Sequence, residues 1–196
     1  TLLGGFQCQL DGAAFAACTS PKTLPATADG SHTFTVKAID TAGNLGQTSY
    51  TWTIDTDPPT ITLTQTPSNF SNDSTPTFAF TADEPIPAGF QCRLDAAGTF
   101  VPCSSPTTLS ATADGPHTFT VRGNDAAGNL AQASYAWTID SVAPAVSITA
   151  KPPDPSGVST AHFEFSAADQ TSVAYQCQLD AGVFQSCASP RDISGL

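Results

Sequence analysis

The chain has 196 residues, and its composition excludes several classes of function before any motif is considered. It carries 6 Lys plus Arg against 17 Asp plus Glu, a formal net charge of −11, and phosphate backbones bind to clustered cations. The printed residues contain no apolar run long enough to cross a bilayer. We therefore expect neither DNA nor RNA as a partner and no membrane span in these residues.

The first predicted element is a cysteine hairpin. Residues 6–10 alternate apolar and polar side chains, which is the period of a half-buried strand. A short turn from Asp11 then leads to a returning strand that ends at the second cysteine. A turn centred on Ala13 would place Cys8 directly opposite Cys18, within the separation that a disulfide needs.

Three more strands are predicted after this hairpin. Residues 20–24 form a short strand bounded by prolines, and an Asp-Gly turn at 29–30 precedes a strand whose side chains alternate cleanly over residues 32–38. The segment 40–44 is a tight connection whose Gly and Asn tolerate positive φ and whose Asp accepts backbone N–H bonds. The last long strand includes residues 50–54.

Most landmarks of these elements return further along the chain after 85 residues, an interval that we call the repeat length, while Cys8 and Cys92, like Cys103 and Cys187, are 84 residues apart. The repeat length separates Phe34 from Phe119, Trp52 from Trp137, Phe78 from Phe163 and Cys92 from Cys177. Such internal periodicity is the signature of a repeat protein. Six cysteines allow fifteen pairings, and the repeat favours the local one three times: Cys8 with Cys18, Cys92 with Cys103 and Cys177 with Cys187.

The middle copy supplies strands that the first copy lacks. Residues 61–63 and 78–80 alternate apolar with small polar side chains, so a complete copy has seven predicted strands and no helical period. This pattern predicts an all-β fold of tandem immunoglobulin-like antiparallel β-sandwiches, each with a disulfide inside one hairpin. Proline-bearing linkers near 58 and 144 divide the chain into the C-terminal part of a repeat (1–56), a complete repeat (57–140) and the N-terminal part of another (141–196).

The two partial copies leave apolar faces that need a partner. Residues 1–56 lack the opening strands and residues 141–196 lack the long closing strands. Uncovered faces and open sheet edges favour association. Two hypotheses stay open: the residues are a window of a longer repeat array, or neighbouring copies complete each other in a fibre by strand addition.

Several motifs carry a resemblance to a known family. The series Cys-x-Leu-Asp, Ser-Pro, Ala-Asp-Gly-x-His-Thr-Phe-Thr-Val, Asp-x-Ala-Gly-Asn and Tyr-x-Trp-Thr-Ile-Asp resembles the bacterial immunoglobulin-like, or fibronectin-III-like, repeats of large secreted or surface-anchored proteins. The resemblance implies a sandwich that serves as a stalk, a spacer or an adhesive module. Two departures from antibody domains, a disulfide within one hairpin and a Trp on the last strand, give no reason to carry over antibody recognition loops.

The histidines and cysteines do not form a recognisable catalytic or zinc motif. His32 and His117 are repeat equivalents after an Asp-Gly turn, while His162 lies in a different strand. We expect His32 and His117 to bond turn backbone. The cysteine spacing fits no common zinc pattern, and persistent disulfides are typical of an oxidising, extracellular setting.

Calcium is the one metal that the sequence suggests. Clustered carboxylate and amide oxygens at the pole of a sandwich and in the linker could hold this ion between modules. The capping of tight turns is the alternative role for the turn aspartates. The candidate ligands are Asp40, Asn44, Asp55, Asp57, Asp125, Asn129 and Asp140.

These observations predict a non-enzymatic extracellular structural protein. Its repeats would act as a stalk, spacer or surface fibre, with neighbouring repeats and other copies as partners. The alternative is an adhesive module that engages a glycan or a protein, for which Phe70 is the clear exposed aromatic candidate.

Overall fold

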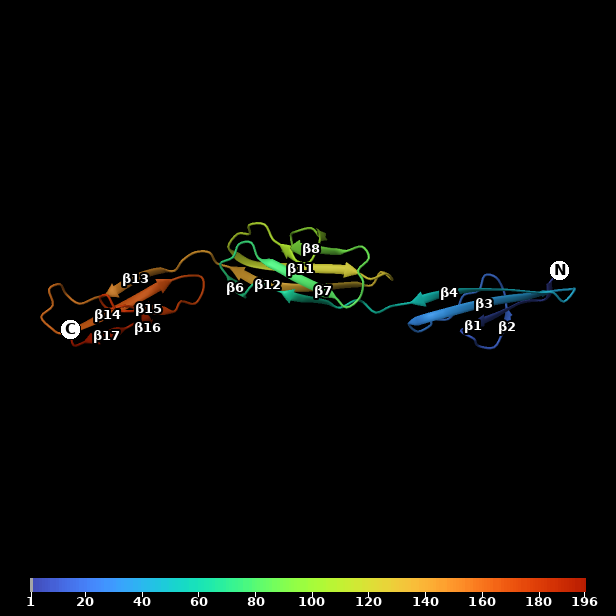
Figure 1. Ribbon diagram of the computed structural model, residues 1–196, viewed down its shortest axis with the longest axis horizontal. Coiled ribbons are helices and arrows are strands. Elements are labelled where there is room, and N and C mark those ends of the chain that lie inside the picture. Colours follow the sequence, from blue (N-terminus) through green and yellow to red (C-terminus); the bar gives the residue numbers. More distant parts are fainter. Residues whose placement is uncertain (1) are drawn as a thin grey trace. The chain divides into compact units, whose positions relative to one another are not determined.

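The computed structural model describes the backbone of residues 2–196 and the side chains from residue 5 onward. Every regular element in that part of the chain is a β-strand, which confirms the predicted all-β class (Figure 1). No helix there has the length and apolar character needed to cross a bilayer. The chain divides into two compact units, one of Thr1–Ile61, Ala82–Phe90 and Arg122–Gln132 and the other of Thr62–Thr81, Gln91–Val121 and Ala133–Leu196.

The first unit contains a four-stranded antiparallel sheet in the order β2-β1-β3-β4. Its strands are β1 (Leu2–Leu10), β2 (Ala16–Cys18), β3 (Gly30–Asp40) and β4 (Leu45–Ile54). β3 and β4 pair from Gly30 opposite Ile54 to Ile39 opposite Leu45. Their period-2 sequences place Phe34 opposite Tyr50 and His32 opposite Trp52, so one face of the hairpin is aromatic.

The hairpin disulfides are confirmed, but their predicted register is wrong. Cys8 is opposite Ala16 and Cys18 is opposite Phe6, so the bond joins diagonal positions and not directly facing ones. The cause is the turn, which is centred on Asp11 and Gly12, both at positive φ, and closed by a 3.0 Å bond from Ala13 N to Leu10 O. The diagonal Cα–Cα distance is 5.8 Å, within the usual disulfide range.

The other two cysteine pairs have the same separation of their backbones. Cys92 and Cys103 lie 5.7 Å apart and Cys177 and Cys187 lie 5.8 Å apart, measured between Cα atoms. In the third copy Tyr175 is opposite Cys187, so the diagonal register recurs.

A second correction concerns residues 20–24, which form no strand. The equivalent segment of the middle copy does form one, β10 (Thr107–Thr108), because it pairs with β7 (Thr77–Ala82). A two-residue strand exists only where a neighbour accepts its hydrogen bonds. The first sheet contains no strand equivalent to β7 in that place.

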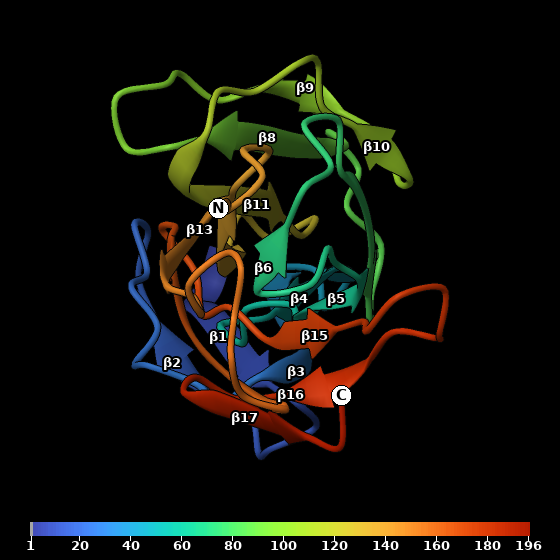
Figure 2. The ribbon, with the colours of Figure 1, turned by 90° about the vertical axis from the view of Figure 1, so that its left-hand side faces the viewer.

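The second unit holds most of two sheets that form the sandwich of the middle copy. One has the order β10-β7-β5 and the other the order β6-β12-β11-β8-β9, with the short β9 and β10 labelled in Figure 2. The strands not yet bounded are β5 (Ile61–Gln65), β6 (Phe70–Ser71), β8 (Phe90–Leu94), β9 (Val101–Cys103), β11 (Gly115–Asn124) and β12 (Leu130–Ile139). β6 lies between the predicted strands at 61–63 and 78–80, where no strand was predicted, and it pairs in parallel with the end of β12, so this copy has one strand more than predicted.

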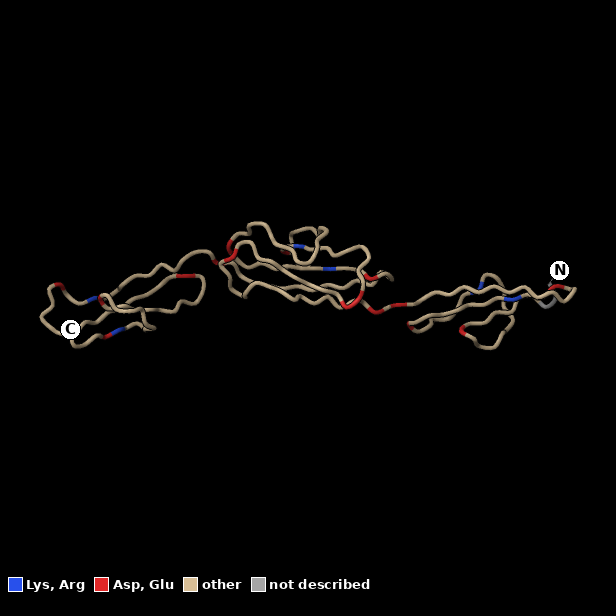
Figure 3. The backbone as a smooth tube through the Cα atoms, viewed as in Figure 1, with Lys and Arg blue, Asp and Glu red and all other residues tan. Residues whose placement is uncertain are grey.

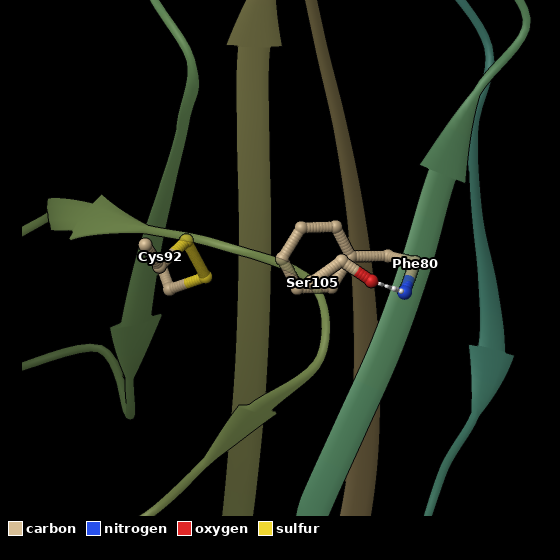
Figure 4. Close-up of a disulfide and its surroundings, with 4 residues drawn as sticks. Phe80, Cys92 and Ser105 are labelled. Atoms are coloured by element: carbon tan, nitrogen blue, oxygen red, sulfur yellow. Dashed lines mark hydrogen bonds between the residues drawn. A yellow bond between two sulfur atoms is a disulfide. The ribbon is translucent and has the colours of Figure 1, made fainter.

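An aromatic core lies between these two sheets. Phe78 on β7 stacks on Phe119 of β11 with ring centroids 4.2 Å apart, and it also contacts Trp137 of β12 at 5.1 Å. Phe78, Phe119 and Trp137 are at most 2% exposed. Figure 4 shows how the segment after the disulfide reaches this core: Ser105 Oγ accepts a 2.8 Å bond from the backbone N of Phe80.

The third copy contributes two smaller sheets to the second unit, β13-β14-β17 and β15-β16. Its strands are β13 (Ala145–Ala150), β14 (Thr160–Ala168), β15 (Tyr175–Cys177), β16 (Gln185–Cys187) and β17 (Arg191–Ser194). Val146 is 62% exposed here, whereas its equivalent Ile61 in the middle copy is 8% exposed. Apolar faces of the same pattern are therefore buried only where a facing sheet is present. The repeat boundaries at 57 and 140 stay a prediction.

We predict that Phe78→Ala destabilises the middle sandwich by about 3–5 kcal/mol, the usual cost of removing a buried phenyl ring. Phe70→Ala is the matched control, because Phe70 lies in the same sandwich but is 58% exposed; its cost should stay below about 1 kcal/mol. Urea unfolding followed by Trp137 fluorescence, in a Trp52→Phe background, measures both. Equal losses in the two variants would contradict the packing described here.

Candidate functional site

The strongest concentration of polar side chains lies where β4 passes into β5, within the first unit. We call it the first joint and define it by Asp55, Glu84, Asp125 and Asn129. Asp55 directly follows β4, Glu84 lies just beyond the end of β7, and the other two flank the β11–β12 turn. Figure 3 shows acidic positions in red along this linker and the neighbouring turns.

The turn from Asp125 to Asn129 is built by its own side chains. Asp125 Oδ1 accepts bonds from Gly128 N at 2.7 Å and Asn129 N at 2.9 Å, and Asp125 Oδ2 accepts one from Asn129 Nδ2 at 2.8 Å. Burial raises the pKa of Asp125, but the bonds from Asn129 and from the turn backbone outweigh burial and lower it. The carboxylate is therefore held ionised although it is only 6% exposed.

Asn129 also binds the linker. Its Nδ2 donates to the carbonyl oxygen of Asp55 at 3.0 Å and to that of Asp57 at 3.2 Å. The linker is thus fastened from the side of the middle copy. Thr56, between these two residues, is fastened from the other side, because its N and Oγ1 donate to the Asp29 carboxylate at 2.9–3.1 Å.

Three carboxylates converge at this joint. One oxygen each of Asp55, Glu84 and Asp125 lies within 4.8 Å of the others. Burial and then the charges of Asp55 and Asp125 raise the pKa of Glu84. Like charges at this distance repel each other, so Glu84 is the carboxylate least favoured in its ionised form.

The three carboxylates fit a hard cation. Calcium binds oxygen atoms at 2.3–2.6 Å, so two of its ligand oxygens lie at most about 5 Å apart. The observed separations meet this limit. Asp57 is not a member of this carboxylate group; it contributes its backbone carbonyl oxygen, which accepts a bond from Asn129 at 3.2 Å. The calcium hypothesis stays a prediction, with Glu84 in the place expected for Asp57.

Asp40 and Asn44 do not join this site. They lie at the β3–β4 turn, and the register of that hairpin puts Asp55 at the opposite end. There Asp40 Oδ1 accepts bonds from the backbone N atoms of Ala42 and Asn44 at 2.9 and 2.8 Å. Asp40 and Asn44 therefore lie apart from Asp55 and Asp57 and cap their own turn, and their role as calcium ligands stays a prediction.

A related pair of acids occurs in the second unit. Asp140 and Asp169 follow Asp55 and Glu84 by one repeat length, and both line a cavity of about 350 Å³ together with Phe70 and Val142. Bonds from the backbone N and the Oγ1 of Thr171 lower the pKa of Asp169. Asp140, predicted as a ligand, thus has an acidic neighbour that the sequence analysis did not single out.

Glu84 and Asp169 were missed because each follows a strand in a segment without a recognisable motif. The signal that could have found them is the repeat itself, since aligning the copies places these two acids at the same position of the repeat. His32 and His117 contact turn backbone, as predicted: their Nε2 atoms lie against the carbonyl oxygens of Ala28 and Ala113.

Comparison with known proteins gives one informative similarity. The chain is 36% identical over 128 residues to chitinase A1 of Niallia circulans, an alignment that covers 60% of this chain and 18% of that protein. The chain therefore spans less than a fifth of that relative's length. No family model matches the chain.

We predict that Glu84→Gln raises the melting temperature at pH 7 in the presence of a chelator. The pKa of Glu84 is raised above its usual 4.5, so its ionised form costs stability at pH values above the raised pKa, and protonation removes the cost as the pH falls. The advantage of the variant should disappear below about pH 4.5. Scanning calorimetry over pH 4–8 measures it, and a variant less stable than wild type at pH 7 would contradict the repulsion.

If calcium binds at the first joint, millimolar calcium raises the melting temperature of the chelated protein, because a ligand of the folded state stabilises it by mass action. The gain should shrink in Asp125→Asn, whose amide oxygen still accepts the two backbone bonds of the turn but which lacks the charge and the second acceptor oxygen. Asp40→Asn, the equivalent substitution at the β3–β4 turn, should keep it. Titration calorimetry that shows no heat, with an unchanged melting temperature, would sink the calcium hypothesis.

Proposed function

We propose that this chain is a non-enzymatic extracellular spacer made of immunoglobulin-like or fibronectin-III-like repeats. Its sandwich and hairpins place disulfides in three copies of one motif, which suits an oxidising environment. The aligned part of the relative is a fraction of a protein named as a chitinase. A match to so small a part of an enzyme is what an accessory segment that links or extends the enzyme would give. We therefore do not assign chitinase activity to this chain.

The observation that supports a spacer is the fastening of the linkers. Side chains bind the linker after β4 from both directions, Asp29 to Thr56 and Asn129 to the carbonyl oxygens of Asp55 and Asp57. The first of these fastenings recurs one repeat length later, where Asp114 accepts bonds from Ser141 N and Oγ at 2.9–3.1 Å. Each bond removes torsional freedom from a segment that would otherwise be a flexible connection.

A glycan- or protein-binding module is the second candidate, and one feature favours it. Phe70 is 58% exposed and lines the cavity that also contains Asp140 and Asp169. An exposed aromatic ring beside hydrogen-bonding groups can pack against a sugar. The name of the relative points to chitin as the first ligand to try.

A stiff spacer should hold the residues on the two sides of its linker at a nearly constant distance, so the width of that distance distribution tests the proposal. Single-molecule energy transfer between dyes on non-canonical residues at positions 47 and 88, both exposed and both in the first unit, reports on the linker. We expect a narrow distribution that broadens in Asn129→Ala. Asn44→Ala is the matched control, because Asn44 binds its own Asp40 at 2.8 Å in the same way but is at the other end of its hairpin from the linker.

A broad distribution in the wild-type protein, or an unchanged width in Asn129→Ala, would count against the spacer. Sedimentation with insoluble chitin separates the second candidate: retention that is lost in Phe70→Ala supports binding. Release of reducing sugar from chitin by the purified chain would overturn the non-enzymatic assignment.

A further inference from the structure

Two histidines of this chain have an acceptor oxygen at each ring nitrogen. His32 Nδ1 lies 2.7 Å from Asp11 Oδ2, and its Nε2 lies 2.7 Å from the carbonyl oxygen of Ala28. The second copy repeats this arrangement with His117, Asp95 and Ala113 at 2.9 and 2.8 Å. Both imidazoles are nearly covered, at 11% and 13% exposed.

The ring geometry decides the charge of these histidines. A neutral imidazole has one N–H, so it can donate to one acceptor and must turn its other nitrogen lone pair to the second. A carbonyl oxygen cannot donate. The Oδ1 of each aspartate accepts a backbone bond, from Thr33 N to Asp11 at 2.7 Å and from Thr118 N to Asp95 at 2.8 Å, and this bond favours the ionised carboxylate, whose Oδ2 can only accept a bond from the ring. Both ring nitrogens therefore carry protons when the two contacts are made.

Each of these imidazoles joins two segments that are 21 or 22 residues apart in the chain, the turn of the cysteine hairpin and the start of the long strand with the loop before it. The aspartate is at the turn of the cysteine hairpin, the carbonyl belongs to the loop before the long strand, and the histidine is on that strand. The ring also lies 5.6 Å from an indole, Trp52 for His32 and Trp137 for His117. A cation at this distance from an indole is stabilised by the ring quadrupole.

We infer that His32 and His117 are held as imidazolium ions and act as pH-sensitive contacts, which fix the turn of each cysteine hairpin to the neighbouring long strand and loosen that turn when they lose a proton. The disulfide closes the hairpin on itself and backbone pairing joins it to the sheet, while the histidine contact holds the turn end of the hairpin. This inference does not rest on the spacer function.

The surrounding charges agree with this assignment. Asp11 and Asp95 are the carboxylates that face the two rings, while Asp29 and Asp114 in the adjacent loops bind Thr56 and Ser141. Arg93, on the strand before Asp95, lies over the Phe100 ring at 4.5 Å. The strands that carry the two indoles contain no charged residue.

The direction of the pKa shifts follows from these contacts. The bond to Asp11, and after it the bond to Ala28, raises the pKa of His32. Burial lowers the pKa of His117, but the bonds to Asp95 and Ala113 outweigh burial and raise it. A histidine with a raised folded pKa contributes its full stability below about pH 6.5 and loses it as the pH rises through the folded pKa.

Ring ¹⁵N chemical shifts of the full chain test the charge directly. We expect the His32 and His117 rings to show two protonated nitrogens at pH 7, and their titration midpoints to lie above the usual 6.5. Asp11→Asn and Asp95→Asn keep a turn residue that tolerates positive φ but remove the charge, and each should move the midpoint of its own histidine to lower pH. Asp180→Asn is the matched control, because Asp180 has the same turn conformation and no histidine among its hydrogen-bond partners or ion pairs in the described residues.

A second measurement follows the loosening of the turn itself. Hydrogen exchange of the backbone amides of Thr33 and Thr118, which donate to the same aspartates, should quicken as the pH rises through the measured midpoints by more than the intrinsic base-catalysed increase. His32→Gln and His117→Gln should abolish this excess. Neutral rings at pH 7, or titration midpoints that stay unchanged in Asp11→Asn and Asp95→Asn, would refute the inference.

Discussion

The contact between the two sheets of the middle copy is the constraint on which the architecture depends. A strand with period-2 alternation has one apolar face, and that face is stable only against a second sheet. Phe78, Phe119 and Trp137 meet this requirement with rings 4.2 and 5.1 Å apart. The equivalent face of the first copy has no such cover in the described residues, and Tyr50 there is 71% exposed. The alternating sequence pattern thus suffices to form a sheet, while burial of the sheet's apolar face depends on whether a second sheet lies against it.

Hydrogen bonding to aspartate is the second constraint on this structure. It explains how a strongly acidic chain can fold with few lysines and arginines. Most aspartates accept hydrogen bonds from backbone N–H groups of turns and linkers and so do not need a lysine or arginine partner. Such bonds contribute to the lowered pKa values of six of them: Asp11, Asp40, Asp83, Asp95, Asp125 and Asp169. Much of the negative charge behind the net value of −11 therefore belongs to aspartates that cap the turns and linkers between strands.

The repeat made much of this fold predictable. Alternation predicted the strands, and three cysteine pairs with separations of 10, 11 and 10 residues predicted the disulfides, because both depend on local pattern. The predicted register of the cysteine hairpin was wrong because register depends on where the turn begins. Positive φ at Asp11 and Gly12 centres the turn on these residues and not on Ala13. The strand at 20–24 failed for another reason, because a strand edge needs a partner such as β7 that local sequence does not reveal.

The candidate site shows the same limit at longer range. Asp125 and Asn129 were identified as a turn pair from their spacing of four, and they are bonded as that spacing suggests. Their meeting with Asp55 and Glu84 requires residues from two much earlier segments of the chain to arrive at one end of the sandwich. No local pattern contains that information. Comparing repeats does contain part of it, because an acid recurs one repeat length after both Asp55 and Glu84.

The joints and the sandwich core respond to different conditions, and this separates two kinds of stability in the chain. The core depends on apolar burial, which salt and pH alter little near neutrality. The first joint combines donors from Asn129, which hold the linker, with repulsion among carboxylates that includes Glu84. Screening by salt, protonation or a bound cation each reduces that repulsion without touching the core. Conditions that screen or neutralise these carboxylates therefore act on the first joint before they act on the apolar core of the sandwich.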